Sequence, residues 1–403
     1  MFFLKTLISL LLVVVADVFT VRGVRGVFPQ FSGRHARGIR TAVVAQAVFA
    51  LVVTVSGFLL QYRVHDYRWF TVYYYLFGLL LVLYGPKLLF VVSFFADMLF
   101  FRRKQRHIFA KCGIAASIVL TAFMVWGVFC GRFDYRVERI SLTCNALPDR
   151  FDGFRIVQLS DLHAGGMYGY AHRLVQMVDI VNEIQPDVIA FTGDFVNNFA
   201  EELPPVIPVL SRLRAEAGKF AILGNHDYGG YSGWASPADS VQNQRALEGN
   251  ISLMGFRLLK NEAVVLEKDS ANRIAIVGVE NWGTRKRKNY PRRGDIVAAT
   301  SVSDVPFKIL LSHDPTFWQQ HINGKTTIQL TLSGHTHGTQ MGIWLGKKRF
   351  SPLQIMFPYW AGLYSENGQY LYVNNGVGVI GFPGRIGMPP EITVIELKKP
   401  VAQ

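Results

Sequence analysis

Cysteine is scarce in this chain, and acidic residues are outnumbered by basic ones. The 403 residues include 3 cysteines, and 28 Asp and Glu side chains stand against 42 Lys and Arg. The cysteines are odd in number and scattered, at Cys112, Cys130 and Cys144, so they match neither a disulfide framework nor a zinc-binding pattern. They therefore do not indicate whether the protein works in an oxidising or a reducing compartment. The positive excess is a feature of nucleic-acid binders. Much of it lies in short stretches between apolar segments, however, and membrane topology explains those charges more simply.

Charged side chains are also rare in four long apolar stretches of the first 131 residues. These stretches are about Phe2–Val21, Thr41–Leu60, Phe70–Phe100 and Gly113–Cys130. One membrane span needs about 20 apolar residues. The third stretch is overlong and contains Gly85-Pro86-Lys87, which is typical of a kinked span or of a span with an interfacial segment. We therefore predict a transmembrane region with about four helices over 1–131, the first of them uncleaved, followed by a connector with a first strand over 132–152 and a soluble domain over 153–403.

The short loops between these stretches predict the orientation of the chain. Basic residues gather after the first and third stretches and are sparse after the second, which holds Arg63 and Arg68. The positive-inside rule then places the soluble domain outside the cytoplasm. Two acidic residues, Asp17 and Asp97, lie near predicted span ends, so we expect both to reach the membrane interface. The basic residues of the two loops are Arg22, Arg25, Arg34, Arg37 and Arg40, and Arg102, Arg103, Lys104, Arg106 and Lys111.

After residue 152 the pattern changes to short β-branched runs separated by helical segments. Helical periodicity covers Ala171–Ile184 and Pro204–Arg214, and this alternation predicts an α/β fold. The later runs lie closer together, which favours mixed pairing. The predicted strands are Phe154–Leu159, Val188–Thr192, Phe220–Leu223, Ile274–Val279, Phe307–Leu311, Ile328–Leu332, Tyr370–Val373 and Ile392–Leu397.

Polar residues with metal-binding side chains follow five of these strands. Ligand sites of open α/β sheets lie beyond the carboxyl ends of strands, so we expect the five segments to converge. Glycines at 193, 224, 334 and 338 allow sharp bends beside them. The candidate residues are Asp161, His163, Asp194, Asn225, His226, Asp227, His313, His335 and His337.

Carboxylate and imidazole ligands suit manganese, iron or zinc, and a carboxylate can bridge two ions. Two divalent metals can bind a phosphate and generate a hydroxide that attacks phosphorus. His226 follows Asn225 in the chain and is expected to stabilise phosphoryl oxygens or to protonate the leaving oxygen. We expect Asp227 to orient His226 by accepting its other ring proton.

The ordered motifs resemble those of the calcineurin-like metallophosphoesterase superfamily, and most of all its YkuE/YaeI-like branch. The resemblance covers about Phe151–Leu397 and rests on Ser-Asp-Leu-His, Gly-Asp-Phe-Val, Gly-Asn-His-Asp, Leu-Ser-His-Asp-Pro and Ser-Gly-His-Thr-His-Gly. It implies two mixed β-sheets sandwiched by helices, with His226 as the catalytic histidine. It also implies two metals that share Asp194. The first would be held by Asp161, His163, Asp194 and His337, and the second by Asp194, Asn225, His313 and His335.

The substrate is left more open by the sequence. The branch is similar to phosphodiesterases and to a lipid A pathway hydrolase that cleaves UDP-2,3-diacylglucosamine. With a lipid bilayer as partner, a lipid-linked phosphodiester or pyrophosphate is favoured, and no obligate protein partner is evident. Two stretches, Lys347–Phe350 leading into Phe357–Trp360 and the basic run Arg285–Arg293, are candidates for contact with anionic lipid or substrate phosphate. The alternatives are a nuclease or nucleotide phosphodiesterase, for which the sequence offers less support, and a membrane sensor with a structural metal site.

Overall fold

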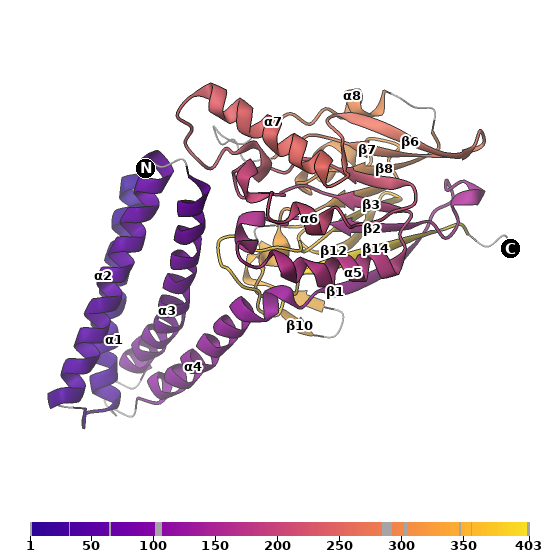
Figure 1. Ribbon diagram of the computed structural model, residues 1–403. Helices are drawn as coiled ribbons and strands as arrows, with labels where there is room; N and C mark the ends of the chain where they lie inside the picture. Colours follow the sequence, from indigo (N-terminus) through magenta and orange to yellow (C-terminus); the bar gives the residue numbers. More distant parts are fainter. Residues whose placement is uncertain are drawn as a thin grey trace. The chain divides into compact units, whose positions relative to one another are not determined.

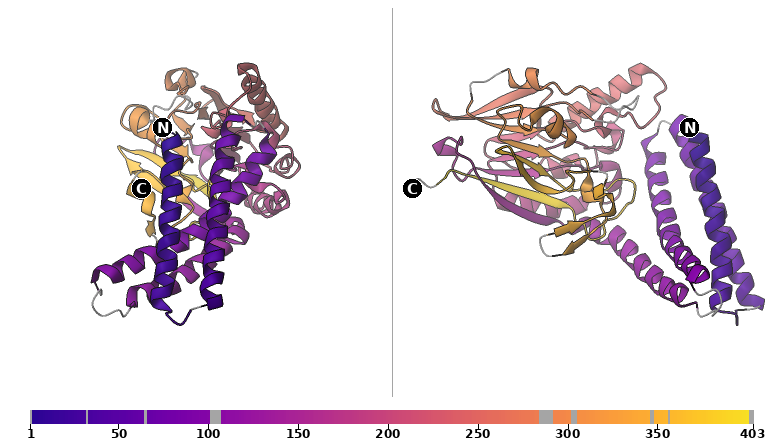
Figure 2. Two further views of the ribbon diagram at one scale, coloured as in Figure 1. Left: turned by 90° about the vertical axis from the view of Figure 1, so that its left-hand side faces the viewer. Right: turned by 180° about the vertical axis from the view of Figure 1, so that it is seen from behind.

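The computed structural model describes residues 2–31, 33–63, 66–100, 107–283, 292–301, 305–345, 348–355 and 357–400. The chain divides into two compact units, shown in Figures 1 and 2. The first comprises Met1–Phe129 with Gly381–Gly384, and the second comprises Cys130–Ile380 with Arg385–Gln403. The basic run predicted to contact phosphate falls largely at 284–291, outside the described residues.

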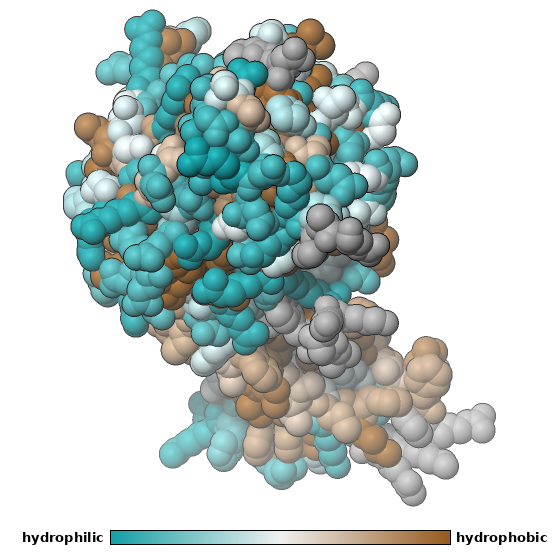
Figure 3. Space-filling model, turned by 90° about the vertical axis from the view of Figure 1, so that its right-hand side faces the viewer, coloured by the Kyte–Doolittle hydropathy of each residue, from teal (hydrophilic) through white to brown (hydrophobic). Residues whose placement is uncertain are grey.

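The first unit consists of four helices, α1 (Phe2–Val27), α2 (Gly33–Arg63), α3 (Tyr67–Phe100) and α4 (Ile108–Phe129). Among the described residues three segments are long and apolar enough to cross a membrane: Gly33–Leu60, Tyr67–Phe100 and Ile108–Phe133. α1 is not among them, so the count of four spans stays a prediction. Large apolar side chains are exposed along these helices, and Figure 3 shows the resulting hydrophobic surface. Despite Pro86, α3 is one continuous helix, and the hydroxyl of Ser117 donates to the Pro86 carbonyl at 2.7 Å.

Asp17 and Asp97 are both buried, which corrects the expectation that these two residues reach an interface. Asp17 on α1 is 6% exposed and forms an ion pair with Lys87 on α3 at 2.6 Å. Tyr84 donates to the same carboxylate, and Lys87 also donates to Gln46 on α2. Asp97 accepts backbone N–H bonds from Phe109 and Ala110 and so caps the start of α4. Charges among apolar helices are costly unless paired, and pairing overrides the tendency to reach water.

We expect Lys87→Met to lower the thermal midpoint of the detergent-solubilised protein. It leaves the buried Asp17 carboxylate without its ion pair, and removing one partner of a buried pair costs about 3–5 kcal/mol. Asp17→Asn combined with Lys87→Met should recover most of the loss, because no unpaired charge remains. Lys111→Met, at an exposed position on α4, is the matched control. A midpoint unchanged in Lys87→Met would contradict the pairing.

The second unit is built from two six-stranded sheets, both mixed, and this confirms the predicted fold class. The first has the order β1-β14-β2-β3-β4-β5, and the second has the order β12-β13-β9-β8-β7-β6. The first contains β1 (Arg136–Thr143), β14 (Glu391–Lys398), β2 (Arg155–Leu159), β3 (Val188–Phe191), β4 (Gly218–Ala221) and β5 (Arg257–Leu258). The second contains β12 (Gly362–Glu366), β13 (Gln369–Val373), β9 (Leu330–Ser333), β8 (Phe307–Leu311), β7 (Asn272–Gly278) and β6 (Glu262–Asp269). A separate hairpin pairs β10 (Ile343–Leu345) with β11 (Lys348–Phe350).

Parallel pairing runs through the centre of each sheet. β2, β3, β4 and β5 pair in parallel, as do β7, β8, β9 and β13. The antiparallel pairs are β14 with β2, β6 with β7, and β12 with β13. β1 lies in the predicted connector and pairs in parallel with β14, so this stretch is an edge strand of the first sheet. The parallel strands therefore present their carboxyl ends along one edge of each sheet.

The two sheets pack face to face, and helices cover their outer faces (Figure 1). Alternate residues of one strand serve different layers. Ile156 of β2 faces the core between the sheets, while Val157 packs beneath α5 (Leu174–Ile184). In the second sheet Ile276 faces the same central core, and Val277 packs in the outer layer near Trp318. Strands buried on both faces read as continuous apolar runs, which is why the sequence marks them clearly.

The helices of this unit differ from the sequence-based expectation. Of the predicted helix Pro204–Arg214, only α6 (Ile207–Leu210) forms, flanked by turns. The sequence did not predict α7 (Pro237–Leu253), whose buried residues are only Asn243, Leu247 and Ile251. A capping box of Ser236 and Asp239 begins α7. α8 (Ile296–Thr300) begins at Asp295, whose carboxylate accepts from two backbone amides.

Candidate metal centre

The candidate ligands occupy the loops that follow five parallel strands. Asp161 and His163 come after β2, Asp194 after β3, and Asn225 after β4, all in the first sheet. His313 follows β8, and His335 and His337 follow β9, in the second sheet. Backbone hydrogen bonds continue between the loops, from Asp161 N to Gly193 O at 2.9 Å and from Gly334 N to His313 O at 3.0 Å. The loops are therefore fixed to one another beyond the ends of the strands.

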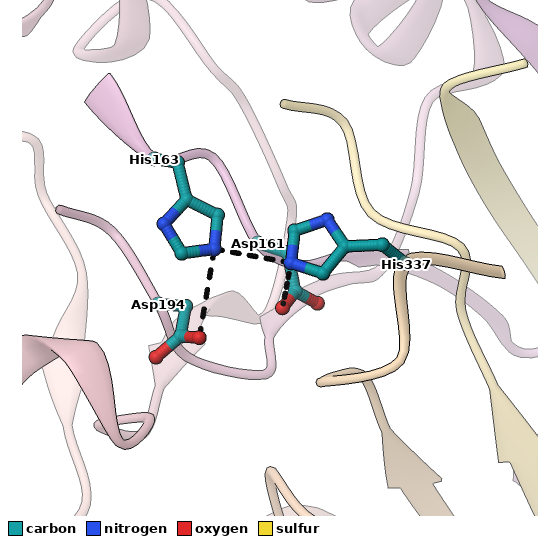
Figure 4. A group of neighbouring side chains, drawn as sticks. All are labelled: Asp161, His163, Asp194 and His337. Carbon is teal, nitrogen blue, oxygen red and sulfur yellow. Dashed lines mark hydrogen bonds and ion pairs between the residues drawn. The ribbon is translucent and has the colours of Figure 1, made fainter. Parts of the chain in front are cut away.

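One group of four side chains converges from both sheets (Figure 4). Asp161, His163, Asp194 and His337 each offer one ligand atom, and all four atoms lie within 4.8 Å of one another. His337 Nε2 is 3.2 Å from Asp161 Oδ1, and His163 Nε2 is 3.6 Å from Asp194 Oδ2. The two imidazole Nε2 atoms are only 3.1 Å apart. This arrangement has the donor set and closeness of a divalent metal site.

A second group shares Asp194 with the first. Asp194, His313 and His335 also place their ligand atoms within 4.8 Å of one another. His313 Nε2 lies 3.1 Å from Asp194 Oδ2 and 3.3 Å from His335 Nδ1. Asn225 completes the group, because its Oδ1 is 3.1 Å from the same His313 Nε2. One carboxylate oxygen, Asp194 Oδ2, thus faces a histidine of each group.

Most of these side chains are buried, and burial shapes their protonation. It lowers the pKa of His163 and His335, which favours the neutral imidazole that a metal requires. For His313, burial is outweighed by the charge of Asp194, which raises the pKa to about 10. Burial opposes the charge of Asp194, but neighbouring histidines, His313 first, hold its pKa well below the usual range. His226 and His335 remain half-buried, so they form the open edge of the site.

The backbone at the ligands is unusual. Asp161, His163, Asp194, His335 and His337 have φ values of 53°, 46°, 60°, 74° and 55°. Such left-handed conformations cost a residue with a side chain on the order of 1 kcal/mol or more, and they persist where the surrounding structure holds them. Gly193 also has a positive φ of 94°, and a Cβ there would lie 2.5 Å from the nitrogen of Gly224. Close contact between the β3 and β4 loops therefore requires glycine at position 193.

His226 and Asp227 lie side by side in the chain but have separate partners, which differs from the expected pair. His226 Nδ1 is 2.8 Å from the carbonyl oxygen of Asn197, so this carbonyl orients the ring. The Asp227 carboxylate accepts from the backbone amides of Asp194, Phe195, Val196 and Gly224. Burial first, and then the charge of Asp194, raise the pKa of Asp227 to about 8, against the effect of these amides. Asp227 thus fixes the loop that carries Asp194.

Several buried side chains around the site escaped sequence reasoning. Asp314 Oδ2 lies 3.9 Å from His335 Nε2, and Arg385 donates to backbone carbonyls that include those of His337 and Gly376. The sequence could have identified Asp314, since it is part of the Ser-His-Asp motif, whereas no motif marks Arg385. Arg349, predicted to contact lipid, forms ion pairs with Glu138 and Glu391 at 3.4 and 3.3 Å. Lys347 lies outside the described residues.

The residues present fit a pair of divalent ions. Two carboxylates, an amide oxygen and four imidazoles form two groups around a shared oxygen, and this set suits manganese, iron or zinc. The close approach of two imidazole Nε2 atoms is explained by a cation that both would ligate.

We expect Asp227→Ala to destabilise the protein and to weaken metal binding. Four buried backbone amides would lose their acceptor, and each such loss costs about 1–3 kcal/mol, so the free energy of unfolding should fall by at least about 3 kcal/mol. Thermal melts of metal-free protein and metal analysis would test this. Asp152→Ala is the matched control, because this exposed carboxylate accepts from the single amide of Lys399. Unchanged melting and metal content in Asp227→Ala would refute the role.

Comparison with known proteins agrees with this geometry. The family description "Calcineurin-like phosphoesterase" matches residues 154–339. YkuE of Bacillus subtilis, a metallophosphoesterase, is 33% identical over 267 residues, covering 64% of this chain and 84% of that protein. A transmembrane protein with metallophosphoesterase domain from Danio rerio is 30% identical, covering 71% of this chain and 62% of that protein. UDP-2,3-diacylglucosamine pyrophosphatase LpxG of Chlamydia trachomatis is 29% identical, covering 71% of this chain and 98% of that protein. The chain thus belongs to the calcineurin-like metallophosphoesterases, and it is a metal-dependent phosphohydrolase.

Proposed function

We propose that the chain is a membrane-anchored phosphoesterase with two metals, which hydrolyses a phosphodiester or a pyrophosphate. The observation that carries the proposal is the shared carboxylate: Asp194 Oδ2 faces His163 at 3.6 Å and His313 at 3.1 Å. When bound, two divalent ions polarise phosphoryl oxygens and lower the pKa of a water. Asp161, His163 and His337 would hold one ion with Asp194. Asn225, His313 and His335 would hold the other with the same carboxylate.

His226 is the group we assign to act on the substrate directly. Its Nδ1 faces the carbonyl of Asn197 at 2.8 Å, so this nitrogen carries the proton and donates it to that oxygen. Nε2 is then the ring nitrogen for the substrate. The backbone N–H of His226 donates to Asp194 Oδ1 at 2.9 Å, which ties the backbone of His226 to the shared carboxylate. When the ring is protonated Nε2 also carries a proton, and from this half-buried position it can donate a hydrogen bond to a phosphoryl oxygen or pass that proton to the leaving oxygen.

His226→Ala should lower kcat for bis-(p-nitrophenyl) phosphate by about 10²–10⁴-fold while both metals stay bound, because no metal ligand is removed. Asp194→Asn should lose activity together with bound metal, since it replaces the shared carboxylate with a neutral amide. The measurement is hydrolysis by detergent-purified protein with and without manganese, alongside metal analysis. Wild-type protein that binds two metals but hydrolyses none of the diester would point to a narrower substrate or a sensor. Wild-type protein that binds no metal would overturn the proposal.

We propose a lipid-linked substrate on three grounds. Apolar helices long enough to span a membrane precede the second unit. The relative LpxG is named for a pyrophosphatase that acts on UDP-2,3-diacylglucosamine. Apolar side chains are exposed on and after the β10–β11 hairpin, with Ile343, Phe350 and Ile355 at 63%, 42% and 91%. The same segment reaches the site, because the Phe357 ring lies 6.4 Å from that of His335. An acyl chain that binds along these residues would place its phosphate near the open edge.

Phe350→Ser combined with Ile355→Ser should raise KM for a diacylated UDP-sugar roughly tenfold, since loss of a large apolar contact costs about 1.5 kcal/mol. KM for the deacylated counterpart should stay unchanged. Leu253→Ser, at an apolar residue of α7 with 68% exposure, is the control. Equal KM changes for both substrates would argue against acyl binding here. Strongly salt-dependent hydrolysis of nucleic acid, with none of the lipid, would favour the nuclease alternative.

We further propose that the chain is a multi-pass protein of the cell (inner) membrane with its catalytic unit on the extracytoplasmic side. Support comes from the basic loops that follow the first and third apolar stretches. This orientation holds whether α1 is a span or is removed, because both cases leave the last apolar helix leading outward. A substrate with a lipid-linked phosphodiester or pyrophosphate exposed on that side fits this orientation better than a UDP-lipid exposed to the cytoplasm.

A further inference from the structure

Tyr231, which no sequence motif singled out, contacts two of the residues on which the proposed activity depends. Its hydroxyl oxygen accepts a hydrogen bond from Asn225 Nδ2 at 2.8 Å. The amide oxygen of Asn225 points the other way and lies 3.1 Å from His313 Nε2. An amide that rotates by 180° would exchange its oxygen and nitrogen. With Nδ2 engaged by the tyrosine, Oδ1 faces the second group of ligands. Of the two amide atoms, only the oxygen can bind a cation there.

The ring of Tyr231 also packs on His226. The two ring centroids are 4.2 Å apart and the planes meet at 17°, which is a stacked arrangement. His163 contacts the same imidazole edge-on, with ring centroids at 4.9 Å. His226 is thereby restrained by stacking on one partner, an edge contact on another and its hydrogen bond to Asn197. A side chain fixed in this way needs little reorganisation in the transition state.

The loop that carries Tyr231 is itself held in place. The backbone N–H of Tyr231 donates to Asn198 Oδ1 at 3.2 Å, and the Asn198 carbonyl accepts from Asn243 of α7 at 3.1 Å. Trp234 donates its indole N–H to the Gly229 carbonyl at 2.9 Å. The tyrosine is thus placed by the same 197–199 loop that orients His226.

We propose that Tyr231 is a positioning residue that acts on the metal centre and on the catalytic histidine at once. The proposal rests on the function proposed above. The hydroxyl sets the orientation of the Asn225 amide and therefore the affinity for the second metal. The ring sets the orientation of His226 and therefore the rate of the chemical step. The hydroxyl and the ring can be removed one after the other. The effect on metal affinity can therefore be separated from the effect on the rate of the chemical step.

Tyr231→Phe and Tyr231→Leu separate the two contributions. Phenylalanine keeps the stack and removes the hydroxyl, so the affinity for the second manganese should fall about 10–100-fold, as for loss of other groups that orient metal ligands. At saturating manganese, kcat of Tyr231→Phe should stay within about threefold of wild type. Leucine removes both contributions, so manganese affinity should fall by the same factor and kcat should fall about tenfold or more even at saturation. Tyr370→Phe, at the far end of β13 from the site, is the matched control.

The measurements are manganese titration by calorimetry on metal-free full-length protein in detergent, its thermal midpoint, and bis-(p-nitrophenyl) phosphate hydrolysis. Asn225→Ala allows a double-mutant cycle with Tyr231→Phe. In the Asn225→Ala background, Tyr231→Phe should cause no further change in manganese affinity, because the hydroxyl acts through the Asn225 amide. Unchanged manganese affinity in Tyr231→Phe would overturn the proposal, as would an equal loss in both backgrounds. Both outcomes are read from binding alone, so they stay distinct from a wild-type protein that binds two metals without hydrolysis, which would instead defeat the proposed function.

Discussion

The carboxylate of Asp194 is the constraint on which the rest of the site depends. Its Oδ2 faces histidines of both ligand groups, and its Oδ1 accepts the N–H of His226. Its own N–H is held by Asp227, and its backbone is in the left-handed region. A carboxylate that contacts both ligand groups and the backbone of His226 tolerates little displacement. The buried hydrogen bonds of Asp227 are best understood as the means by which the chain keeps this one side chain in place.

Neither sheet completes a metal group alone. The first sheet supplies three ligands of the first group and needs His337 from the second sheet. The second sheet supplies His313 and His335 and needs Asp194 and Asn225 from the first. Within each group, the distance between ligands from different sheets is therefore set by the apolar core between the sheets, where Ile156, Ile276 and Leu332 pack. Packing far from the site thus sets how closely the ligands of each group approach one another.

The sequence predicted the parts of the fold that carry strong patterns. Strands buried on both faces, such as β8, were located well because their apolar runs are continuous. α7 was missed because only Asn243, Leu247 and Ile251 of its 17 residues are buried, so no apolar stripe marks it. At the site, motifs identified the residues that converge, and the structure brings all nine to one edge of the sheets. The partner of His226, the backbone carbonyl of Asn197, could not be predicted, because every residue has a backbone carbonyl and the residue type does not mark this one.

The position of β14 has a consequence for how the protein is made. This strand, residues 391–398, lies between β1 and β2, although nearly 250 residues separate it from β1 in the chain. β1 therefore has no neighbour in the sheet until residue 398 has left the ribosome, and β2 lacks one of its two neighbours for as long. The apolar helices of the first unit are synthesised much earlier than the strand that completes this sheet. The topology thus delays completion of the first sheet until the end of synthesis, and β1 and β2 lack this partner until then.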